Sequence, residues 1–577
     1  MDSLNPAAGP VVYPRASGDL DSPRKPLRRA LFFALGFLGA FAIGYYVYRY
    51  LDGKPLRSAN TILSIFGLAI LPAFWWADRG RHGRLTAVLT FVLATMTIAG
   101  VLTNMERHIF HDRRPMYWNA FHYILATKYF DEVGYLDLYR AAALADDEMN
   151  KVFQANNGTI RDMRLYKRVP IRRQIVEARR DGLKDRFTPE RWEEFKRDLD
   201  SMLIKRSAKF WGGPINDRGF NPSPAWLVLH RPLLNVYPFH KEWGIKDLTD
   251  ASSWMLLAVV VAFWWALGLR YALFATLWFT VYFGNYGKIL GTYFGYDWFV
   301  YFAFFFALAA KGWWKSGAPF LAYSGMMRGF TGMAAFPAAF RWLWDAVRHR
   351  AIPRQGTGYL VAVGVCCVLL LGLGSMTQRG TGAWSEWIEK ISVHSEHHPT
   401  GVKRIGLKYL FANEYTSGEW EDSHRVMKRR LKEMKPVYRA VSFTLIALTL
   451  LAAIRRDPLD ATILFLPLVF FSLVISRYYL SVGVVLLAWR SLDRGHGLGQ
   501  LASAMWVFAI PVFYYLYNPG VDTARRTWWW VNVMLLVYCV AVVANFLVRD
   551  AADLYRAAKL SGEAPEQSDD EDLAVAA

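Results

Sequence analysis

Cysteine is scarce in this chain, whose 577 residues include three: Cys366, Cys367 and Cys539. All three lie inside apolar runs, where a small polarizable thiol packs well and a bridge between loops is geometrically excluded. The sequence therefore predicts no disulfide framework, and its cysteines do not reveal the redox compartment.

Several catalytic signatures are also absent. The chain has no P-loop, dinucleotide fingerprint, serine nucleophile elbow, H-E-x-x-H pattern or internal repeat. These absences argue against nucleotide-binding, serine-hydrolase and zinc-protease chemistry. The stretch HSEHHP at 394–399 has the residue type of a metal site, but Pro399 interrupts any helix that begins there. We expect an interfacial outer loop at this point, and neither a metal nor another cofactor.

Negative charge is in short supply. The chain has 68 Lys and Arg residues against 48 Asp and Glu, a net charge of +20. Such a surplus can indicate nucleic acid, but here the basic residues gather at the ends of apolar runs and in one long polar segment. Membrane lipids with anionic or phosphate-bearing headgroups are therefore the expected partners, and nucleic acid is not.

Apolar residues are abundant, at 54% of the chain. Several runs reach or approach the length that crosses the roughly 30 Å hydrocarbon core of a bilayer. Examples are residues 30–47, 62–76, 85–102 and 253–269. The sequence predicts an all-α, polytopic integral membrane protein with about twelve transmembrane helices and a long helical extracytoplasmic loop.

Short basic loops give the expected orientation, because Lys and Arg favour the cytoplasmic side. Such loops lie at residues 78–84, 311–315, 348–354, 455–457 and 490–494. They place both termini in the cytoplasm and the long polar segment outside, in the inner (plasma) membrane of a bacterial-type cell.

The expected organisation has five parts. They are a disordered cytoplasmic tail (1–28), three transmembrane helices (29–103), an extracytoplasmic loop domain (104–250), a transmembrane core (251–549) and an acidic cytoplasmic tail (550–577).

The long polar segment reads as a folded domain. From Thr188 to Trp211 the pattern predicts a helix with Thr188 as N-cap and Pro189 at the first helical position. One face of this helix carries Trp192, Phe195, Leu199, Met202 and Leu203, which we expect to pack in a core. A second amphipathic helix is expected over residues 136–153.

One apolar region, residues 316–345, does not fit a simple span. It carries Arg328, two prolines and several glycines, and both of its flanks are basic. A hairpin that enters the membrane and returns, with Arg328 at its tip, satisfies both constraints. The alternative is an ordinary span with a snorkelling arginine.

Four segments carry a family resemblance. They are WNAFHYILATKYFDEVGYLDLY at 118–139, NPSPAW at 221–226, MMRGFTGMAAFPAAF at 326–340 and SRYYLSVGVVLLAW at 476–489. In this order they resemble elements of superfamily C glycosyltransferases, membrane enzymes that use polyprenyl-phosphate sugars. The resemblance covers roughly residues 84–549. It implies transfer of a sugar from a polyprenyl-phosphate donor to a glycan, lipid or protein acceptor outside the cytoplasm.

Two departures from that family bear on catalysis. Two extra spans precede the loop, and the position nearest the family's essential aspartate is Asn119. An amide cannot act as a general base, so that role falls on Asp112, Glu106 or Asp131, or catalysis is absent. Asp112 is the first choice, because two neighbouring arginines keep it ionised.

Further candidates follow from the same chemistry. Arg328, Arg477 and Lys128 are candidates for contacts with the donor phosphate, because cationic side chains stabilise the departing phosphate. Asn119, His122 and Asn221 are candidates for contacts with sugar or acceptor. Two other classes stay open: a lipid or glycan transporter, and a catalytically inactive relative that serves as an assembly subunit.

Overall fold

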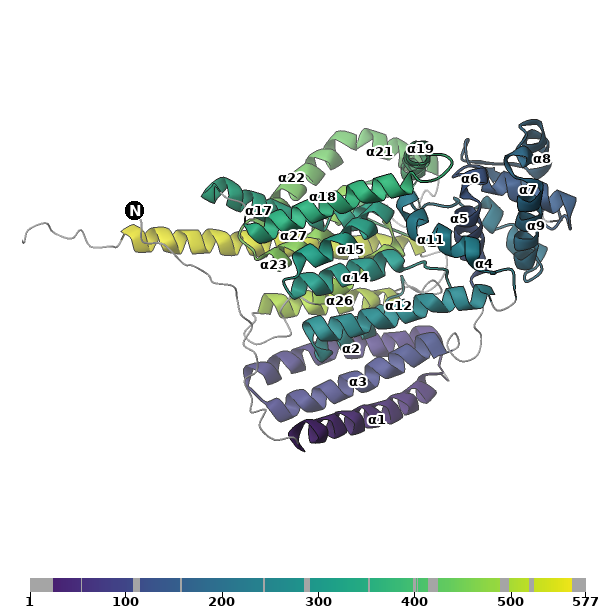
Figure 1. Cartoon of the computed structure of the whole chain (residues 1–577). Coiled ribbons are helices and arrows are strands. Elements are labelled where there is room, and N and C mark those ends of the chain that lie inside the picture. Colours follow the sequence, from purple (N-terminus) through teal and green to yellow (C-terminus); the bar gives the residue numbers. More distant parts are fainter. Residues whose placement is uncertain are drawn as a thin grey trace, which may run out of the picture.

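The computed structural model describes residues 24–52, 54–106, 115–155, 158–241, 244–284, 291–350, 353–397, 401, 403–413, 424–487, 498–517 and 524–562. Within these ranges the chain is almost entirely helical, with two short antiparallel two-stranded ladders. A bundle of long helices carries a smaller domain of short helices at one end (Figure 1). We call this end of the bundle the loop-domain end.

Three long helices begin the chain: α1 (Arg24–Asp52), α2 (Leu56–Arg79) and α3 (Gly83–Glu106). They coincide with the first three apolar runs and lie side by side along one edge of the bundle (Figure 1). Asn60 of α2 and Asn104 of α3 exchange two side-chain hydrogen bonds, at 3.1 and 2.9 Å. Such a pair fixes the register of two otherwise apolar helices.

The loop domain, residues 117–220, follows α3. It contains α4 (Tyr117–Ala120), a π-helical turn (Phe121–Leu125), α5 (Ala126–Lys128), α6 (Phe130–Val133), α7 (Leu138–Glu148), β1 (Thr159–Asp162), β2 (Lys167–Pro170), α8 (Ile171–Arg180), α9 (Pro189–Leu203) and α10 (Ala208–Trp211), with 3₁₀ turns at Lys184–Arg186 and Pro214–Asn216. Strands β1 and β2 pair antiparallel, with Ile160 opposite Val169.

The capping and packing expected for the long helix of this domain are confirmed. The Thr188 side chain accepts a hydrogen bond from Arg191 N, and Pro189 opens α9. The five apolar residues of the expected face are all buried in the domain core. The helix ends at Leu203, earlier than expected, because Ser207 caps a separate helix, α10. The other amphipathic helix is also shorter, and α7 spans Leu138–Glu148.

A buried carboxylate holds three segments of the loop domain together. Asp137 is 3% exposed and accepts hydrogen bonds from Arg140 (3.0 Å), Arg164 (2.7 and 2.8 Å) and Arg186 (3.0 Å). Burial alone would raise the pKa of Asp137, but the hydrogen bonds and charges of Arg164 and Arg140 outweigh it and lower the pKa to about 2.

Asp137→Asn is expected to destabilise the loop domain by about 2 to 3 kcal/mol at pH 7. Because the folded-state pKa of Asp137 is depressed, its stabilisation is present above about pH 4 and is lost as the pH falls toward 2. The difference in the free energy of unfolding between wild type and variant should therefore shrink as the pH falls from about 4 to 2. Hydrogen exchange of the α7 and α8 amides in urea measures this free energy. The exposed Asp185→Asn is the matched control, and an equal loss there would contradict the assignment.

The rest of the chain forms the helix bundle. Its elements are α11 (Pro224–Val236), α12 (Gly244–Leu267), α13 (Leu269–Val281), α14 (Asp297–Ala310), α15 (Trp314–Met327), α16 (Gly329–Gly332), α17 (Ala335–His349), α18 (Arg354–Gly374), α19 (Gly382–His397), β3 (Arg404–Ile405), α20 (Leu407–Ala412), α21 (His424–Glu433), α22 (Lys435–Ala453), α23 (Pro458–Ile463), α24 (Phe465–Ser472), β4 (Ile475–Ser476), a 3₁₀ turn (Arg477–Gly483), α25 (Val484–Leu487), α26 (Leu498–Tyr517) and α27 (Ala524–Gly562).

Six helices of the described ranges are long and apolar enough to cross a membrane. They are Leu56–Arg79, Gly83–Met105, Gly244–Leu267, Arg354–Gly374, Lys435–Ala453 and Arg525–Arg556. This number is half of the expected twelve. Part of the difference lies in short helices: α13 has 13 residues and α14 has 14, so each is about 20 Å long, less than the roughly 30 Å core.

The apolar region around Arg328 turns back on itself. The helix α15 ends at Met327, Arg328 has extended backbone angles (φ −140°, ψ 86°), and α16 and α17 follow. The rings of Trp314 and Trp342 lie 5.2 Å apart, which brings the two outer ends of the hairpin together. At its turn Gly325 lies against Gly332, where a Cβ would come within 2.8 Å of the facing Cα.

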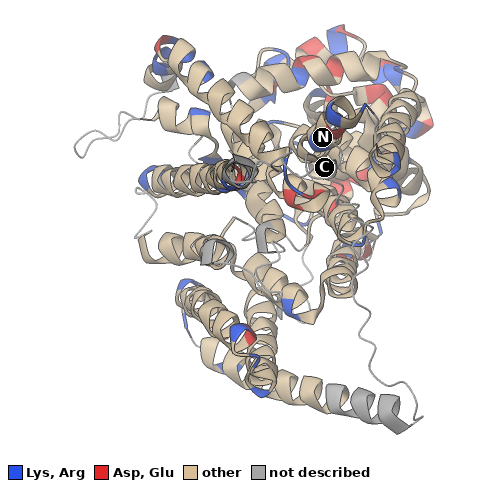
Figure 2. Ribbon diagram, turned by 90° about the vertical axis from the view of Figure 1, so that its left-hand side faces the viewer, with Lys and Arg blue, Asp and Glu red and all other residues tan. Residues whose placement is uncertain are grey.

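Basic side chains gather where helices end opposite the loop domain. Figure 2 views the molecule from that side and shows Lys and Arg at helix ends there. Exposed examples are Arg79, Arg84, Lys311, Lys315, Arg348 and Arg354. These ends belong to α2, α3, α14, α15, α17 and α18.

The two termini differ from the expected organisation. Helix α1 begins at Arg24, within the expected tail 1–28, and α27 continues through the expected boundary at 550 to Gly562. Residues 549–562 contain four alanines and two leucines among charged residues, a composition that favours helix. The acidic residues from 563 onward lie outside the described ranges.

Candidate functional site

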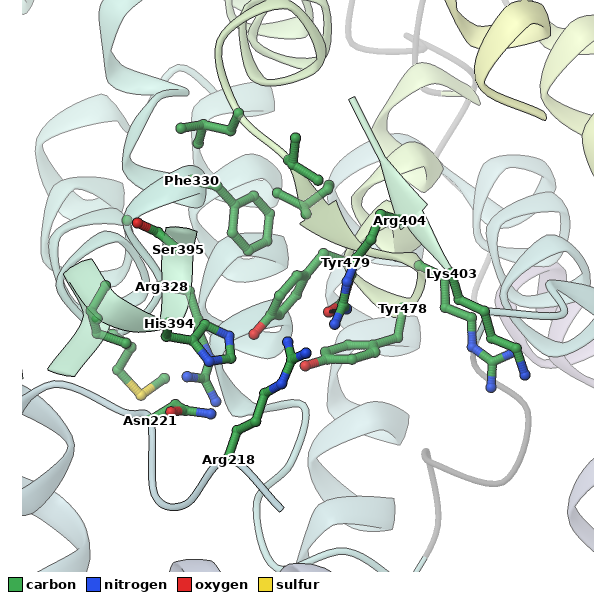
Figure 3. A pocket seen from close by; sticks show the side chains of 18 of the residues that line it. Arg218, Asn221, Arg328, Phe330, His394, Ser395, Lys403, Arg404, Tyr478 and Tyr479 are labelled. Atoms are coloured by element: carbon green, nitrogen blue, oxygen red, sulfur yellow. Dashed lines mark hydrogen bonds between the residues drawn. The ribbon is translucent and has the colours of Figure 1, made fainter. Parts of the chain in front are cut away.

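A polar pocket of about 770 Å³ lies where the loop domain meets the bundle. Four stretches of chain line it: the segment that precedes α11, the hairpin turn around Arg328, the inner face of α19, and the region formed by β3, α20, β4 and the turn after β4. These stretches are far apart in sequence and meet around one space (Figure 3).

The β3 and β4 ladder positions one arginine of the pocket. Arg404 pairs across the ladder with Ser476, and its guanidinium donates to the Ser476 hydroxyl. Gly406 follows with φ +143°, and a Cβ at this position would overlap the carbonyl oxygen of Leu473. The close approach of the two strands therefore requires glycine here.

The hairpin turn positions a second arginine. Arg328 donates from Nη2 to the hydroxyl oxygen of Tyr123 at 2.6 Å. Tyr123 lies in the π-helical turn of the loop domain, a feature that often occurs at functional sites. Ser324 bonds both Trp298 O (2.6 Å) and Thr331 Oγ1 (2.9 Å), which ties the two sides of the turn together.

The segment before α11 supplies a third arginine. Arg218 and Arg404 point toward the same central space from opposite sides, with Asn221 below (Figure 3). Within the described ranges, four buried polar atoms on these residues have no hydrogen-bond partner. They are Arg218 Nη1, Arg328 Nε, Arg404 Nε and Asn221 Oδ1. The three arginine atoms are donors and Asn221 Oδ1 is an acceptor, and buried polar atoms of this kind require a ligand or water to satisfy them.

The pocket carries a large surplus of positive charge. Six described lining residues are cationic: Arg218, Arg328, Lys403, Arg404, Lys408 and Arg477. Asp217 is the single carboxylate among the lining residues that the structure describes. An array with this balance attracts a multiply charged anion, and arginine forks match phosphate oxygens.

Burial lowers the pKa of two basic side chains near the pocket. Burial, followed by the charge of Arg218, lowers the pKa of Arg404 to about 10. Lys390 lies one turn before His394 on α19 and donates to Phe220 O. Burial lowers the pKa of the Lys390 ammonium to about 7, against the opposing effect of Glu386 and Asp217. Lys390 therefore loses its positive charge as the pH rises through about 7.

Aromatic rings form another part of the pocket wall. Phe330, Tyr478 and Tyr479 lie together, with ring centroids 4.7 Å apart for Phe330 and Tyr479 and 4.3 Å apart for Tyr478 and Tyr479. Trp387 lines the pocket from α19 and donates to Asn221 O at 3.2 Å. Flat apolar faces beside charged groups suit a ligand with one polar and one less polar part.

Three of the residues selected from the sequence line this pocket: Arg328, Arg477 and Asn221. They come from the hairpin, the turn after β4 and the segment before α11. The structure thus brings together side chains that lie more than 100 residues apart in sequence.

Two charged candidates have partners elsewhere. Lys128 is buried, and its ammonium lies 2.7 Å from carboxylate oxygens of both Glu194 and Asp198. Asp131 pairs with Arg231 and accepts a hydrogen bond from Gln378 N at 3.0 Å. Both residues hold elements together in this structure, and neither lines the pocket.

Two polar candidates are also engaged in packing. Asn119 Oδ1 accepts a hydrogen bond from Tyr293 N at 2.7 Å. His122 is buried between Trp118 O and the Tyr139 hydroxyl, each at 2.7 Å, and its burial lowers the pKa of the imidazole. The Asn119 contact fixes the start of the loop domain against the bundle, and the His122 contacts lie within the loop domain.

Two of the three candidate bases cannot be placed. Asp112 lies outside the described residues, and so does the side chain of Glu106, which ends α3. The segment that holds Asp112 connects α3 to α4 and therefore begins and ends at the loop-domain end of the bundle.

Asp297, the first residue of α14, is a carboxylate inside the bundle. A charged residue at the end of an apolar run usually lies at the interface with water, whereas the structure buries Asp297 to 3% exposure. Its carboxylate lies 3.2 Å from His230 Nε2 and accepts from Trp298 N at 2.7 Å. The whole first turn of α14 is buried in the bundle.

The histidine-rich stretch belongs in part to the pocket. His394 lines it and bonds Tyr166 of the loop domain at 2.6 Å. Among the described residues no group of three or more His, Cys, Asp or Glu side chains could hold a metal ion. The side chain of His397 and all of His398 lie outside the described part.

Sequence reasoning missed several pocket residues, above all Asp217, Arg218, Lys403 and Arg404. Asp217 and Arg218 stand shortly before the matching segment NPSPAW, and this proximity is the signal that could have identified them. The Lys403 and Arg404 pair gave no such signal, because its ladder partner lies 72 residues further along the chain.

Comparisons with known protein families, with curated proteins and with solved structures find no match to this chain. The pocket and the fold are therefore the basis for a functional assignment.

Proposed function

We propose that this protein is a membrane glycosyltransferase that moves a sugar from a polyprenyl-phosphate donor to an extracytoplasmic glycan, lipid or protein acceptor. The observation that carries the proposal is the charge of the pocket. Among its described lining residues, six are cationic and one is a carboxylate. The match in segment order to superfamily C glycosyltransferases points to the same chemistry.

The cationic residues suit the leaving group of such a reaction. A lipid phosphate departs with negative charge, and positioned guanidinium groups stabilise that charge as it develops. Arg328, Arg218 and Arg404 contribute buried N–H groups that lack a partner among the described residues. We assign them, together with Arg477, to the donor phosphate.

The remaining parts of the site suit sugar and acceptor. The rings of Phe330 and Tyr479 offer apolar faces for the less polar surface of a sugar, and Asn221 offers an amide for a hydroxyl. A general base is needed to take the proton from the acceptor hydroxyl. We assign this role first to Asp112, and Asp217 is the alternative that lines the pocket.

The proposed setting is the inner (plasma) membrane, with about twelve crossings, both termini in the cytoplasm and the loop domain outside. The exposed Lys and Arg side chains at helix ends opposite the loop domain support this orientation, because basic loops favour the cytoplasmic side. The short helices α13 and α14 would then complete crossings through irregular backbone buried in the bundle.

Cysteine labelling tests this orientation. In a variant with the three native cysteines replaced by alanine, an impermeant thiol reagent applied to intact cells should modify Leu165→Cys, in the loop domain. It should spare Ser316→Cys at the opposite end. Both positions are exposed, so local access does not decide the result. The reverse labelling pattern would overturn the orientation.

Mass spectrometry of lipid-linked sugars in a strain that lacks the protein tests the function. Loss of a transferase causes its polyprenyl-phosphate sugar to accumulate, and the acceptor loses one sugar. An unchanged lipid pool together with an unchanged set of glycans would remove the transferase proposal.

One observation favours a second candidate, a catalytically inactive relative that serves as an assembly subunit. Asn119 occupies the position nearest the family's essential aspartate, and its amide has a packing role against Tyr293 N. In that case donor binding through the arginines is retained, while replacement of the candidate bases changes nothing.

A further inference from the structure

A row of basic side chains lies outside the pocket, on α21 and the first turns of α22. We call it the basic stripe and define it by five exposed residues: Arg425, Arg429, Lys432, Lys435 and Arg439. The three residues on α21 are spaced i, i+4 and i+7 and therefore share one helical face. Glu433 is the single acidic residue from 424 to 453, and it lies 3.8 Å from Arg429.

The stripe lies at the loop-domain end of the bundle. Helix α21 packs on α20, and Lys408 of α20 lines the polar pocket described above. The Lys408 ammonium lies 5.6 Å from the ring centroid of Tyr438. In the sequence, Tyr438 stands between Lys435 and Arg439 of the basic stripe. The opposite side of α21 is held by Met427, which is buried and contacts Arg525. The basic face is therefore fixed outward.

The same face becomes apolar one turn further along α22. Lys435, Arg439 and Phe443 are spaced by four residues each, and the Phe443 side chain is 70% exposed. A surface that passes from cationic to apolar along one helix matches an amphiphile with an anionic head and an apolar tail. A soluble polyanion would use the cations but not Phe443.

We propose that the basic stripe binds the phosphate headgroups of anionic phospholipids in the leaflet on the loop-domain side, with their acyl chains along the apolar face of α22. The surplus of Lys and Arg at this end is unusual, because basic residues normally concentrate on the cytoplasmic side. Bound phosphate neutralises that surplus. The proposal does not depend on the transferase function.

Native mass spectrometry of the full-length protein in neutral detergent, titrated with phosphatidylglycerol or phosphatidylcholine, tests the proposal. The variant is Arg429→Gln/Lys432→Gln/Arg439→Gln. Its affinity for phosphatidylglycerol should fall on the order of 100-fold, because each basic residue near an anionic lipid surface contributes roughly a fivefold factor. Binding of phosphatidylcholine should not change.

A charge-matched variant, Lys167→Gln/Arg168→Gln/Arg172→Gln, removes three exposed cations from the loop domain and should bind phosphatidylglycerol as the wild type does. Equal affinity in the stripe variant, or an equal fall in this control, would overturn the proposal.

The apolar half of the site is tested by Phe443→Ser, with heparin as a soluble polyanion. Phe443→Ser should weaken phosphatidylglycerol binding several-fold and leave heparin binding unchanged. If the stripe variant lost heparin binding alone, with phosphatidylglycerol unaffected, the stripe would belong to an anionic polymer.

Discussion

Arg328→Leu is expected to abolish sugar transfer while the protein still inserts and folds. Arg328 stands at the hairpin turn and donates to Tyr123, and its Nε is buried without a partner among the described residues. Removal of a positioned arginine from a phosphate typically costs 2 to 5 kcal/mol or about 30- to 5,000-fold in affinity. We therefore expect undecaprenyl phosphate to bind at least about 30-fold more weakly, measured by quenching of intrinsic fluorescence.

Arg270→Leu is the control for this experiment. Arg270 is similarly shielded, at 22% side-chain exposure, but it pairs with Asp78 far from the pocket. The control should retain binding and transfer. In cells, Arg328→Leu should accumulate the same lipid-linked sugar as a deletion strain. Wild-type turnover in this variant would mean that the hairpin is purely structural.

Asp112→Asn is expected to lower the transfer rate by about 100- to 10,000-fold, the usual cost of losing a general base. Undecaprenyl phosphate binding should change little, because the arginines remain. Glu106→Gln and Asp131→Asn should act more weakly. For Asp131 the structure gives a reason, since its carboxylate is held by Arg231 and Gln378 N.

Asp217→Asn separates the two candidate bases. Asp217 lines the pocket, and its Oδ2 accepts the indole N–H of Trp118 at 2.6 Å. If Asp217→Asn removes activity and Asp112→Asn does not, the base is Asp217. If all four carboxylate variants stay active, none of these carboxylates is the general base. The proposal that the protein is a transporter would then be favoured over a transferase.

Local signals in the sequence were sufficient for much of the fold. The cap at Thr188, the proline after it and the apolar face of α9 are set by neighbouring residues, so periodicity identified them. The turn at Arg328 was also identifiable, because basic flanks and helix-breaking residues occur within one short segment.

Partners that are distant in sequence could not be foreseen. Lys128 is as plausible a phosphate ligand as Arg328 when each is considered alone, but Asp198, 70 residues later, neutralises it. Arg404 gave no signal because a two-residue strand, β3, is too short to show any period, and its position depends on Ser476. The number of crossings was similarly uncertain, because apolar composition does not distinguish a full span from the short α13 and α14.

The last helix has a geometric consequence. At 39 residues α27 is about 58 Å long, roughly twice the thickness of a hydrocarbon core. An ion pair between Arg456 and Asp550 marks the level at which it leaves its neighbours, and the remainder projects from the end opposite the loop domain (Figure 1). Residues 551–562 form a rigid spacer of about 18 Å. A fluorescent reporter fused after Gly562 would be held about 18 Å from the bundle. This distance is short enough for energy transfer to a dye at the membrane surface.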